Sequence, residues 1–336
     1  MSDLIDAGFV RPDGREALAA VTARYAIGIT PEMAGLISAP ADPIARQFVP
    51  DPAEAVTLPE ERGDPIGDHA HSPLPGLVHR YPDRVLLKVT HTCPVYCRFC
   101  FRREMVGPDG DGPMTGAAFA AALAYIRAHP AIFEVILTGG DPLVLSARRI
   151  ADITRHLAAI PHIRVLRWHS RVPVVAPARI TPALTRALKA DGKAVYVAIH
   201  ANHAKEFTPA ADAAIARLAD AGIPLISQSV LLKGVNDNVE ALMDLMRGFV
   251  ARRIKPYYLH HGDLAPGTSH FRVEIARGKA LVAALRGTLS GLCQPSYVID
   301  IPGGFGKIPV NTVIERDGAL FLPDRHGSLH RYPPAC

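Results

Sequence analysis

The chain has 336 residues, of which 49% are hydrophobic and 21% charged, and its formal net charge is +5. This composition excludes collagen-like, low-complexity and disordered proteins, and no apolar run approaches the ~18 residues of a membrane span. The basic residues are dispersed, which favours a solvated surface over a nucleic-acid groove. The N-terminal sequence MSDLIDAGFVRPDG lacks the features of a signal peptide. We therefore expect a folded cytoplasmic protein that binds neither nucleic acid nor membranes.

Residues 1–83 are predicted to be an N-terminal helical and wrapping segment. Helix-compatible stretches at 15–27 and 31–36 precede a tract rich in Pro, Asp and Gly at 39–75. Such a tract is typical of irregular surface structure.

Residues 84–293 repeat one unit, a β-branched run followed by a helix-period segment. The predicted strands are 84–90, 134–138, 163–168, 194–199, 223–230 and 254–259, and the predicted helices are 116–129, 147–159, 182–190, 212–221, 239–251 and 273–289. This alternation predicts parallel βαβ units. Six units are fewer than the eight of a closed barrel, so we expect an α/β fold with an open, six-stranded βα partial barrel. Chemistry is then expected at the carboxyl ends of the strands.

Residues 294–336 are predicted to form a small C-terminal β extension, in which PGGFGK and RDG separate the runs SYVIDI, IPVNTVIE and ALFLP. The glycine-rich loop carries Lys307 but lacks the order of a nucleotide-binding loop, because Ile308 follows the lysine. An accessible lysine among glycines suits an amine that bonds covalently to a planar cofactor. A hairpin turn with a surface lysine is the alternative.

Three of the five cysteines, Cys93, Cys97 and Cys100, lie within HTCPVYCRFCFRR with the spacing C-x3-C-x2-C. Three thiolates from one loop can hold three irons of a 4Fe-4S cluster and leave the fourth iron open. Structural zinc needs four ligands, and no second Cys/His pair of the usual form is present. A disulfide would leave the third thiol unpaired. We expect Cys293 and Cys336 not to be ligands.

Polar residues follow the other predicted strands. They are Gly139, Gly140, Asp141, His169, Ser170, Arg171, His200, Asn202, His203, Gln228, Ser229, His260, His261 and Asp263. Any one of them could serve only to satisfy a helix N-terminus. Six loops that converge on one rim instead predict a shared site.

The cysteine spacing, with Phe99 before the last cysteine, resembles the motif of the radical S-adenosylmethionine (SAM) superfamily. The resemblance implies that SAM chelates the open iron and that one-electron transfer splits SAM into methionine and a 5'-deoxyadenosyl radical. It also matches 139–141 to the GGD-type element that contacts the methionine amino group. The cofactor-binding residues expected at this rim are Gly139, Gly140, Asp141, Ser170, His200 and Gln228.

Over roughly residues 75–330 the chain resembles the lysine 2,3-aminomutase family. The matching stretches are HRYPDRVLL, CPVYCRFCFRR, LTGGDPL, HSRVPVVAPARIT, QSVLLKGVND, PYYLHHGDLAPGTSHFR and YVIDIPGGFGKIP. The resemblance implies that Lys307 bonds covalently to pyridoxal 5'-phosphate (PLP) and that Arg102 binds the substrate carboxylate, which suits a bidentate guanidinium. It also places Arg80 and Arg84 near the PLP phosphate, although both could be ordinary strand-flanking charges.

The same resemblance matches Asp263 and Asp300 to the two aspartates that hold the substrate ammonium in lysine-acting members. Burying an unpaired ammonium costs several kcal/mol, so carboxylates are expected where lysine is the substrate. Glutamate-acting relatives would need cationic or amide groups there. We therefore expect an isomerase that interconverts L-lysine and β-lysine.

Some alternatives and partners stay open. The enzyme could act on another amino acid or supply β-lysine for modifying elongation factor P, and a non-catalytic iron-sulfur protein is a distant alternative. No zinc is expected, because a zinc-binding cysteine of longer relatives matches Asn238 and the chain ends at Cys336 without a C-x-C-x2-C tail. The expected partners are L-lysine and a one-electron reductase such as flavodoxin or ferredoxin, and a homo-oligomer is compatible with the sequence.

Overall fold

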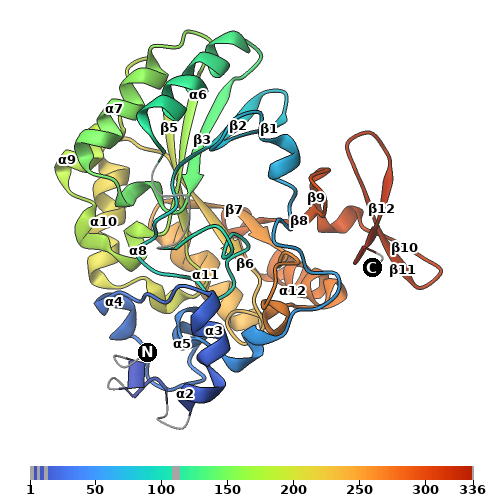
Figure 1. Cartoon of the computed structure of the whole chain (residues 1–336). Helices are drawn as coiled ribbons and strands as arrows, with labels where there is room; N and C mark the ends of the chain where they lie inside the picture. Colours follow the sequence, from blue (N-terminus) through green and yellow to red (C-terminus); the bar gives the residue numbers. More distant parts are fainter. Residues whose placement is uncertain (1–3, 6–7, 11–13, 108–113, 335–336) are drawn as a thin grey trace.

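A nine-stranded sheet with the order β1 to β9 organises the chain, which the computed structural model describes over residues 4–5, 8–10, 14–107 and 114–334 (Figure 1). Strands β2 to β8 are parallel, whereas β1 and β9 pair antiparallel at the two edges. The strands are β1 Leu77–Tyr81, β2 Arg84–Thr90, β3 Glu134–Gly139, β4 Val165–Ser170, β5 Ala194–His200, β6 Leu225–Val230, β7 Ile254–His260, β8 Ser296–Ile301 and β9 Gly306–Pro309. This parallel-dominated sheet confirms the predicted partial barrel.

All six predicted barrel strands are present as β2 to β7, and three further strands extend the sheet. β8 and β9 were expected in a separate C-terminal extension, but β8 pairs in parallel with β7. β1, from the N-terminal segment expected to be helical and wrapping, pairs with β2. The strand count of six was therefore too low, because a local run of residues indicates a strand but not the strand beside it. The division of the chain into three regions stays a prediction.

Five of the seven helices that follow the barrel strands begin at side-chain caps, whereas α8 and α12 do not. Thr115, Ser146, Thr181, Thr208 and Asn238 each accept a hydrogen bond from a backbone N–H in the first turn, which stabilises the helix start. The helices are α6 Gly116–Ala128, α7 Ala147–Ala158, α8 Val172–Val175, α9 Pro182–Leu188, α10 Pro209–Asp220, α11 Val239–Ala251 and α12 Ile275–Thr288. Asn238, at the position where longer relatives are expected to have a zinc ligand, is thus the N-terminal cap of α11.

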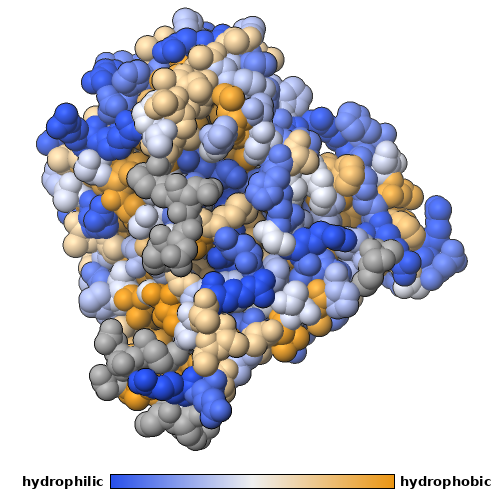
Figure 2. All heavy atoms as spheres, in the orientation of Figure 1, coloured by the Kyte–Doolittle hydropathy of each residue, from blue (hydrophilic) through white to orange (hydrophobic). Residues whose placement is uncertain are grey.

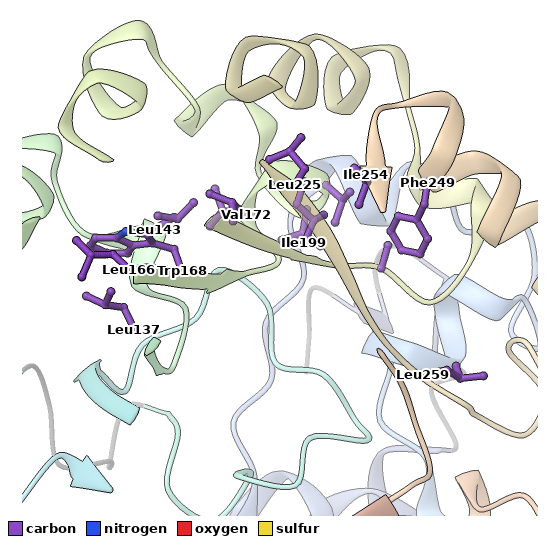
Figure 3. Close-up of a cluster of buried hydrophobic side chains, with 14 of the residues drawn as sticks. Leu137, Leu143, Leu166, Trp168, Val172, Ile199, Leu225, Phe249, Ile254 and Leu259 are labelled. Atoms are coloured by element: carbon purple, nitrogen blue, oxygen red, sulfur yellow. The ribbon is translucent and has the colours of Figure 1, made fainter. Parts of the chain in front are cut away.

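The core lies between the sheet and these helices. Leu137, Leu166 and Trp168 of neighbouring strands are fully buried, and Phe249 of α11 belongs to the same buried cluster (Figure 3). Burying a large apolar side chain contributes roughly 1.5–3 kcal/mol. The buried strand residues fix the register of the sheet and thereby the positions of the residues at the strand ends.

The N-terminal segment contains short helices, and the expected helix at 15–27 is divided into two. Its elements are α2 Gly14–Ala17, α3 Ala19–Arg24, α4 Pro31–Ala34, α5 Pro43–Phe48 and the 3-10 turns Pro52–Ala55 and His69–His71. Thus α5 lies within the tract that was expected to be irregular. Asp42 caps this helix by accepting from the Ile44 amide, and the following proline suits the first helical position.

A second sheet of three antiparallel strands, β10 Ile314–Arg316, β11 Ala319–Pro323 and β12 Leu329–Tyr332, stands off from the barrel in Figure 1. The predicted run IPVNTVIE is divided between β9, a 3-10 turn and β10. Hydrophilic residues are spread over the face shown in Figure 2. Within the described ranges, no helix has the length and apolar character needed to cross a membrane.

Candidate functional site

The predicted site residues lie at the ends of neighbouring strands of the large sheet. The ladder pairs Thr90 with Gly139, His200 with Gln228, His260 with Val298, and Asp300 with Lys307. β9 runs antiparallel to β8, so Lys307 near the start of β9 lies opposite Asp300 near the end of β8. The glycine loop therefore returns the lysine to the rim at which the parallel strands end.

The three motif cysteines lie between β2 and α6 and form no disulfide. Burial raises the pKa of the Cys93 thiol well above its ordinary value, with further contributions from Asp141, Cys100 and Cys97, and burial raises the pKa of Cys100 to about 11. The charge of bound irons is what would convert such thiols into thiolate ligands. Cys293 lies buried in the apolar core, and Cys336 lies outside the described residues.

The donor set suits a cluster better than a single ion. Among the described residues, no three or more His, Cys, Asp or Glu side chains are grouped closely enough to hold one metal ion. A 4Fe-4S cluster instead binds each cysteine through a different iron, so its ligands need not converge on one point. Three free thiols on one short loop fit that requirement.

Arg171 supplies a buried cation beside this loop, a role that the sequence did not indicate. Its guanidinium donates to Cys97 Sγ at 2.8 Å, to Glu206 Oε2 at 2.8 Å and to Gln47 Oε1 at 2.5 Å. A neighbouring cation favours the thiolate form of a cysteine. Because Gln47 and Glu206 belong to distant segments, no local motif could have shown this network.

The glycines after β3 allow two loops to pass very close together. A Cβ on Gly139 would lie 2.3 Å from the Thr90 carbonyl oxygen, and one on Gly140 would lie 2.4 Å from that of Thr92. Gly139 also has a φ of +113°, a conformation that favours glycine. The Gly140 amide donates to the Thr90 carbonyl at 2.6 Å. The glycines therefore join the GGD segment to the start of the cysteine loop.

Asp141 and Ser170 contact each other at this point. Ser170 Oγ donates to Asp141 Oδ1 at 2.7 Å, and the backbone amides of Arg171 and Val172 donate to Asp141 Oδ2 at 2.6 and 3.1 Å. Burial raises the pKa of Asp141, although these hydrogen bonds oppose the shift. The two side chains thus link the ends of β3 and β4. Contact of either with SAM stays a prediction.

Both the backbone amide and the side-chain amine of Lys307 have partners. Its backbone amide donates to the Tyr81 hydroxyl at 2.8 Å, while Nζ forms an ion pair with Asp300 and lies 3.2 Å from His260 Nδ1. Burial raises the pKa of nearby Asp263 to about 7, and the negative charge of Asp300 adds to this shift. Two carboxylates thus share a small region beside the lysine amine.

Asp68, which the sequence did not single out, pairs with three cations and is fully buried. Its carboxylate lies 3.0 Å from Arg80, 3.2 Å from Arg102 and 3.6 Å from Lys88. Burial raises the pKa of Asp68, but the three cations outweigh this effect and the net shift is downward. Three cations around one carboxylate leave a positive excess, which suits an additional anion.

Arg84 takes a different position from Arg80. Its guanidinium pairs with Asp83 at 2.7 Å and lies 3.8 Å from the centroid of the Tyr81 ring, and its side chain is one-third exposed. Arg80 also lies 3.8 Å from Asp300, at the lysine end of the site. The phosphate contacts expected for both arginines stay predictions.

Two histidines, the half-buried His200 and the buried His260, line the middle of the rim. His200 Nε2 lies 3.3 Å from Asn202 Oδ1, and burial together with the charge of Arg171 lowers the pKa of His200 to about 3. His260 Nε2 lies 3.1 Å from the amide nitrogen of Gln228. His200 and Gln228, on adjacent strands, therefore lie between the cysteine loop and the lysine.

Comparisons with known proteins show what the chain is similar to. Residues 87–246 match the family model of the radical SAM superfamily. A solved structure of a radical SAM methyltransferase from Sphaerobacter thermophilus aligns with 66% of this chain and 68% of its own, with 19% identity and a TM-score of 0.46.

Curated relatives match over more of the chain. An L-lysine 2,3-aminomutase from Acetoanaerobium sticklandii is 42% identical over 96% of this chain and 78% of its own length. Those of Clostridium subterminale (42% identical) and Escherichia coli strain K12 (38% identical) match 88% and 81% of this chain and 71% and 79% of their own lengths. The chain belongs to the lysine 2,3-aminomutase family of radical SAM proteins.

Proposed function

We propose that this protein is an L-lysine 2,3-aminomutase, an isomerase that interconverts L-lysine and β-lysine with a 4Fe-4S cluster, SAM and PLP. The observation that carries the proposal is the geometry of one rim. It brings three free cysteines to the same sheet edge as Lys307, whose amine lies beside a pair of carboxylates. The family relationship supports the same activity.

Cys93, Cys97 and Cys100 would hold the cluster, and Lys307 would hold PLP. The bound cluster supplies one electron to SAM, and bound PLP supplies the carbonyl carbon that carries the migrating amino group. The protein contributes binding and orientation of these groups. Arg171 stabilises negative charge at Cys97, and Tyr81 fixes the backbone of Lys307.

Arg102 is the proposed ligand of the substrate carboxylate. It is buried, and Asp68 and Thr138 orient its two terminal nitrogens from 3.2 and 3.4 Å. Its Nε has no hydrogen-bond partner within the described chain, so the guanidinium keeps donor capacity for an incoming anion.

Asp263 and Asp300 are the proposed ligands of the substrate ε-ammonium. Two carboxylates in one buried region repel each other, which is the cause that follows burial in raising the pKa of Asp263. A bound ammonium relieves this repulsion because it adds the opposite charge. A substrate ending in a carboxylate would instead increase the repulsion, so the arrangement favours lysine over glutamate.

Electron supply and location complete the proposal. A one-electron reductase, such as flavodoxin or ferredoxin, is the proposed electron donor, because the cluster must be in its reduced state to cleave SAM. The free cysteines support the cytoplasm as the location, since reducing compartments keep thiols free.

Product identification tests the function. Reconstituted, reduced protein is incubated anaerobically with isotopically labelled lysine, SAM, PLP and dithionite, and the products are identified by mass spectrometry. Labelled β-lysine that requires both SAM and PLP is the expected result. SAM cleavage without any β-lysine would contradict the proposal and would direct attention to another amino acid.

A further inference from the structure

The amine of Lys307 has a second neighbour whose role neither the motifs nor the relatives assign. His260, the last residue of β7, places its Nδ1 3.2 Å from Lys307 Nζ and 4.0 Å from the Asp300 carboxylate. Its side chain is 11% exposed. The lysine amine, the carboxylate and the imidazole thus form one compact group.

The imidazole of His260 is neutral in this environment. Burial lowers its pKa well below the ordinary value, and the positive charge of Lys307 lowers it further, followed by His200 and His169. The ionisable groups that face it from the packed elements are His169 of β4, His200 of β5, Tyr258 of β7, Asp300 of β8 and Lys307 of β9. A neutral imidazole has one ring nitrogen free to accept a proton.

Gln228 allows His260 to take either neutral tautomer. The side-chain amide nitrogen of Gln228 lies 3.1 Å from His260 Nε2. An amide can present its nitrogen to a ring nitrogen that lacks a proton, or its oxygen to one that carries a proton. Nδ1 can therefore accept a proton from Lys307 or donate one to it, without leaving Nε2 unpaired.

We propose that His260 accepts the proton that Lys307 must lose before its amine can bond to the PLP aldehyde. This inference depends on the proposed function. The proton moves from Nζ to Nδ1, and Nζ then forms a bond to the aldehyde carbon. The aldehyde oxygen takes back that proton, together with the second proton released from Nζ, and leaves as water. Reversal of the same transfers releases Lys307.

Asp300 makes this transfer feasible, although it is not the acceptor. Its carboxylate stabilises the ammonium form of Lys307, which is unreactive as a nucleophile. After the transfer, the positive charge lies on the imidazole, which is 4.0 Å from the same carboxylate. The charge that lowers the pKa of His260 is then no longer on Lys307, so the imidazole becomes a stronger base as the lysine loses its proton.

The rate of PLP attachment tests the proposal without enzymatic turnover. PLP-free protein is mixed with PLP, and bond formation is followed by absorbance and by borohydride trapping across pH 6.5 to 10.5. His260→Asn retains a hydrogen-bonding group near Nδ1 but cannot carry the proton. We expect attachment to His260→Asn to be at least about tenfold slower at pH 7.5, as for loss of a general base. At pH 10.5 it should come within about twofold of wild type, because an ordinary lysine loses its proton to solvent near that pH.

Tyr258→Phe is the matched control, because its ring lies 5.5 Å from His260 and its hydroxyl is not needed for the transfer. This variant should attach PLP at the wild-type rate at every pH. Wild-type attachment by His260→Asn at pH 7.5 would overturn the proposal, as would attachment that stays slow at pH 10.5. Persistence of the bound-PLP absorbance in Lys307→Ala would instead show that the proposed function, with Lys307 as the PLP residue, is wrong.

Discussion

At the scale of single residues, Lys307 is the residue to which the proposed PLP chemistry is most directly tied. Lys307→Ala should abolish the absorbance of covalently bound PLP while leaving the iron content unchanged, because neither its amine nor its backbone contacts the cysteines. Borohydride reduction followed by peptide mapping measures the attachment site. Lys255→Ala, which removes an amine that donates to the carbonyls of Gly291, Leu292 and Gln294, should behave as wild type. Label on any other lysine would contradict the assignment.

Asp263 and Asp300 determine the proposed preference for lysine. Replacing both by Asn keeps their shape but leaves a bound ε-ammonium unpaired, which should cost about 3 to 5 kcal/mol in lysine turnover. SAM cleavage without substrate should survive, because neither residue contacts the cysteine loop. Since Asp300 also pairs with Lys307, the bound-PLP absorbance is measured first. Turnover within about threefold of wild type, near 0.7 kcal/mol, would show that these aspartates do not bind the ammonium.

The pKa of Asp263 predicts how the enzyme depends on pH. Burial and the charge of Asp300 raise this pKa to about 7 in the free protein, so the carboxylate gains a proton as the pH falls below about 7. The substrate ammonium keeps its charge throughout this range and loses one of its two proposed carboxylate partners. We expect kcat/KM for lysine to fall by about tenfold per pH unit below pH 7. Asp263→Asn should lower kcat/KM at pH 8 and remove most of its fall below pH 7. If kcat/KM of this variant falls below pH 7 as steeply as that of the wild type, another group causes the fall.

At the scale of elements, the sequence was informative wherever a pattern is local. The strands from β2 to β7 and the longer helices between them follow from runs of apolar residues, whereas the short helix α8 was not expected. The cysteine triad and Lys307 are likewise defined by neighbours in sequence. The pairing could not be predicted: the run that forms β8 was expected outside the barrel but pairs with β7, and β1, where no strand was expected, pairs with β2.

The loops that follow β2 and β3 touch at Gly140, and this contact can be tested by mutation. Gly140→Ala places a Cβ 2.4 Å from the Thr92 carbonyl oxygen, so the backbone must move. We expect destabilisation of about 1–3 kcal/mol and a loss of bound iron, since the displaced segment begins the cysteine loop. Thermal unfolding and iron analysis measure these effects. Gly116→Ala is the control, because its Cβ would meet nothing within 4 Å and alanine favours a helix; equal behaviour of the two variants would exclude the crowding argument.

At the scale of the whole molecule, the N-terminal segment completes the site. Asp68 pairs with Arg80 and Arg102, and the Gly67 Cβ position lies 2.4 Å from the Gly304 amide of the lysine loop. These contacts join residues that are far apart in sequence, within a tract that has no periodicity. No signal in the single sequence could therefore identify Asp68 as part of the site. The motif GDHAH contains this aspartate beside two histidines, but it does not indicate what the aspartate contacts.

Glu54, also in the N-terminal segment, pairs with two arginines beside the cysteines, as Asp68 does with arginines near Lys307. Its fully buried carboxylate accepts from Arg98 Nε at 3.0 Å and from Arg98 Nη2 at 2.6 Å, and it also pairs with Arg103. Both arginines flank the last cysteine of the C-x3-C-x2-C motif, Cys100, in sequence. One carboxylate from the N-terminal segment thus compensates two buried cations that frame the cysteine loop.

Glu54→Gln should consequently destabilise the whole protein. The change leaves Arg98 and Arg103 buried beside a neutral amide, and removing one partner of a buried ion pair typically costs about 3–5 kcal/mol. Urea unfolding measures the loss, and reconstituted iron content should fall with it because the cysteine loop loses its support. Asp220→Asn is the control, since it breaks the exposed pair with Arg253, in which both side chains are more than half exposed, and should cost less than about 1 kcal/mol. If the two substitutions cost the same, the N-terminal segment does not hold the cysteine loop through Glu54, and the loop must be ordered by its other contacts, such as those with Gly28, Gln47 and Arg171.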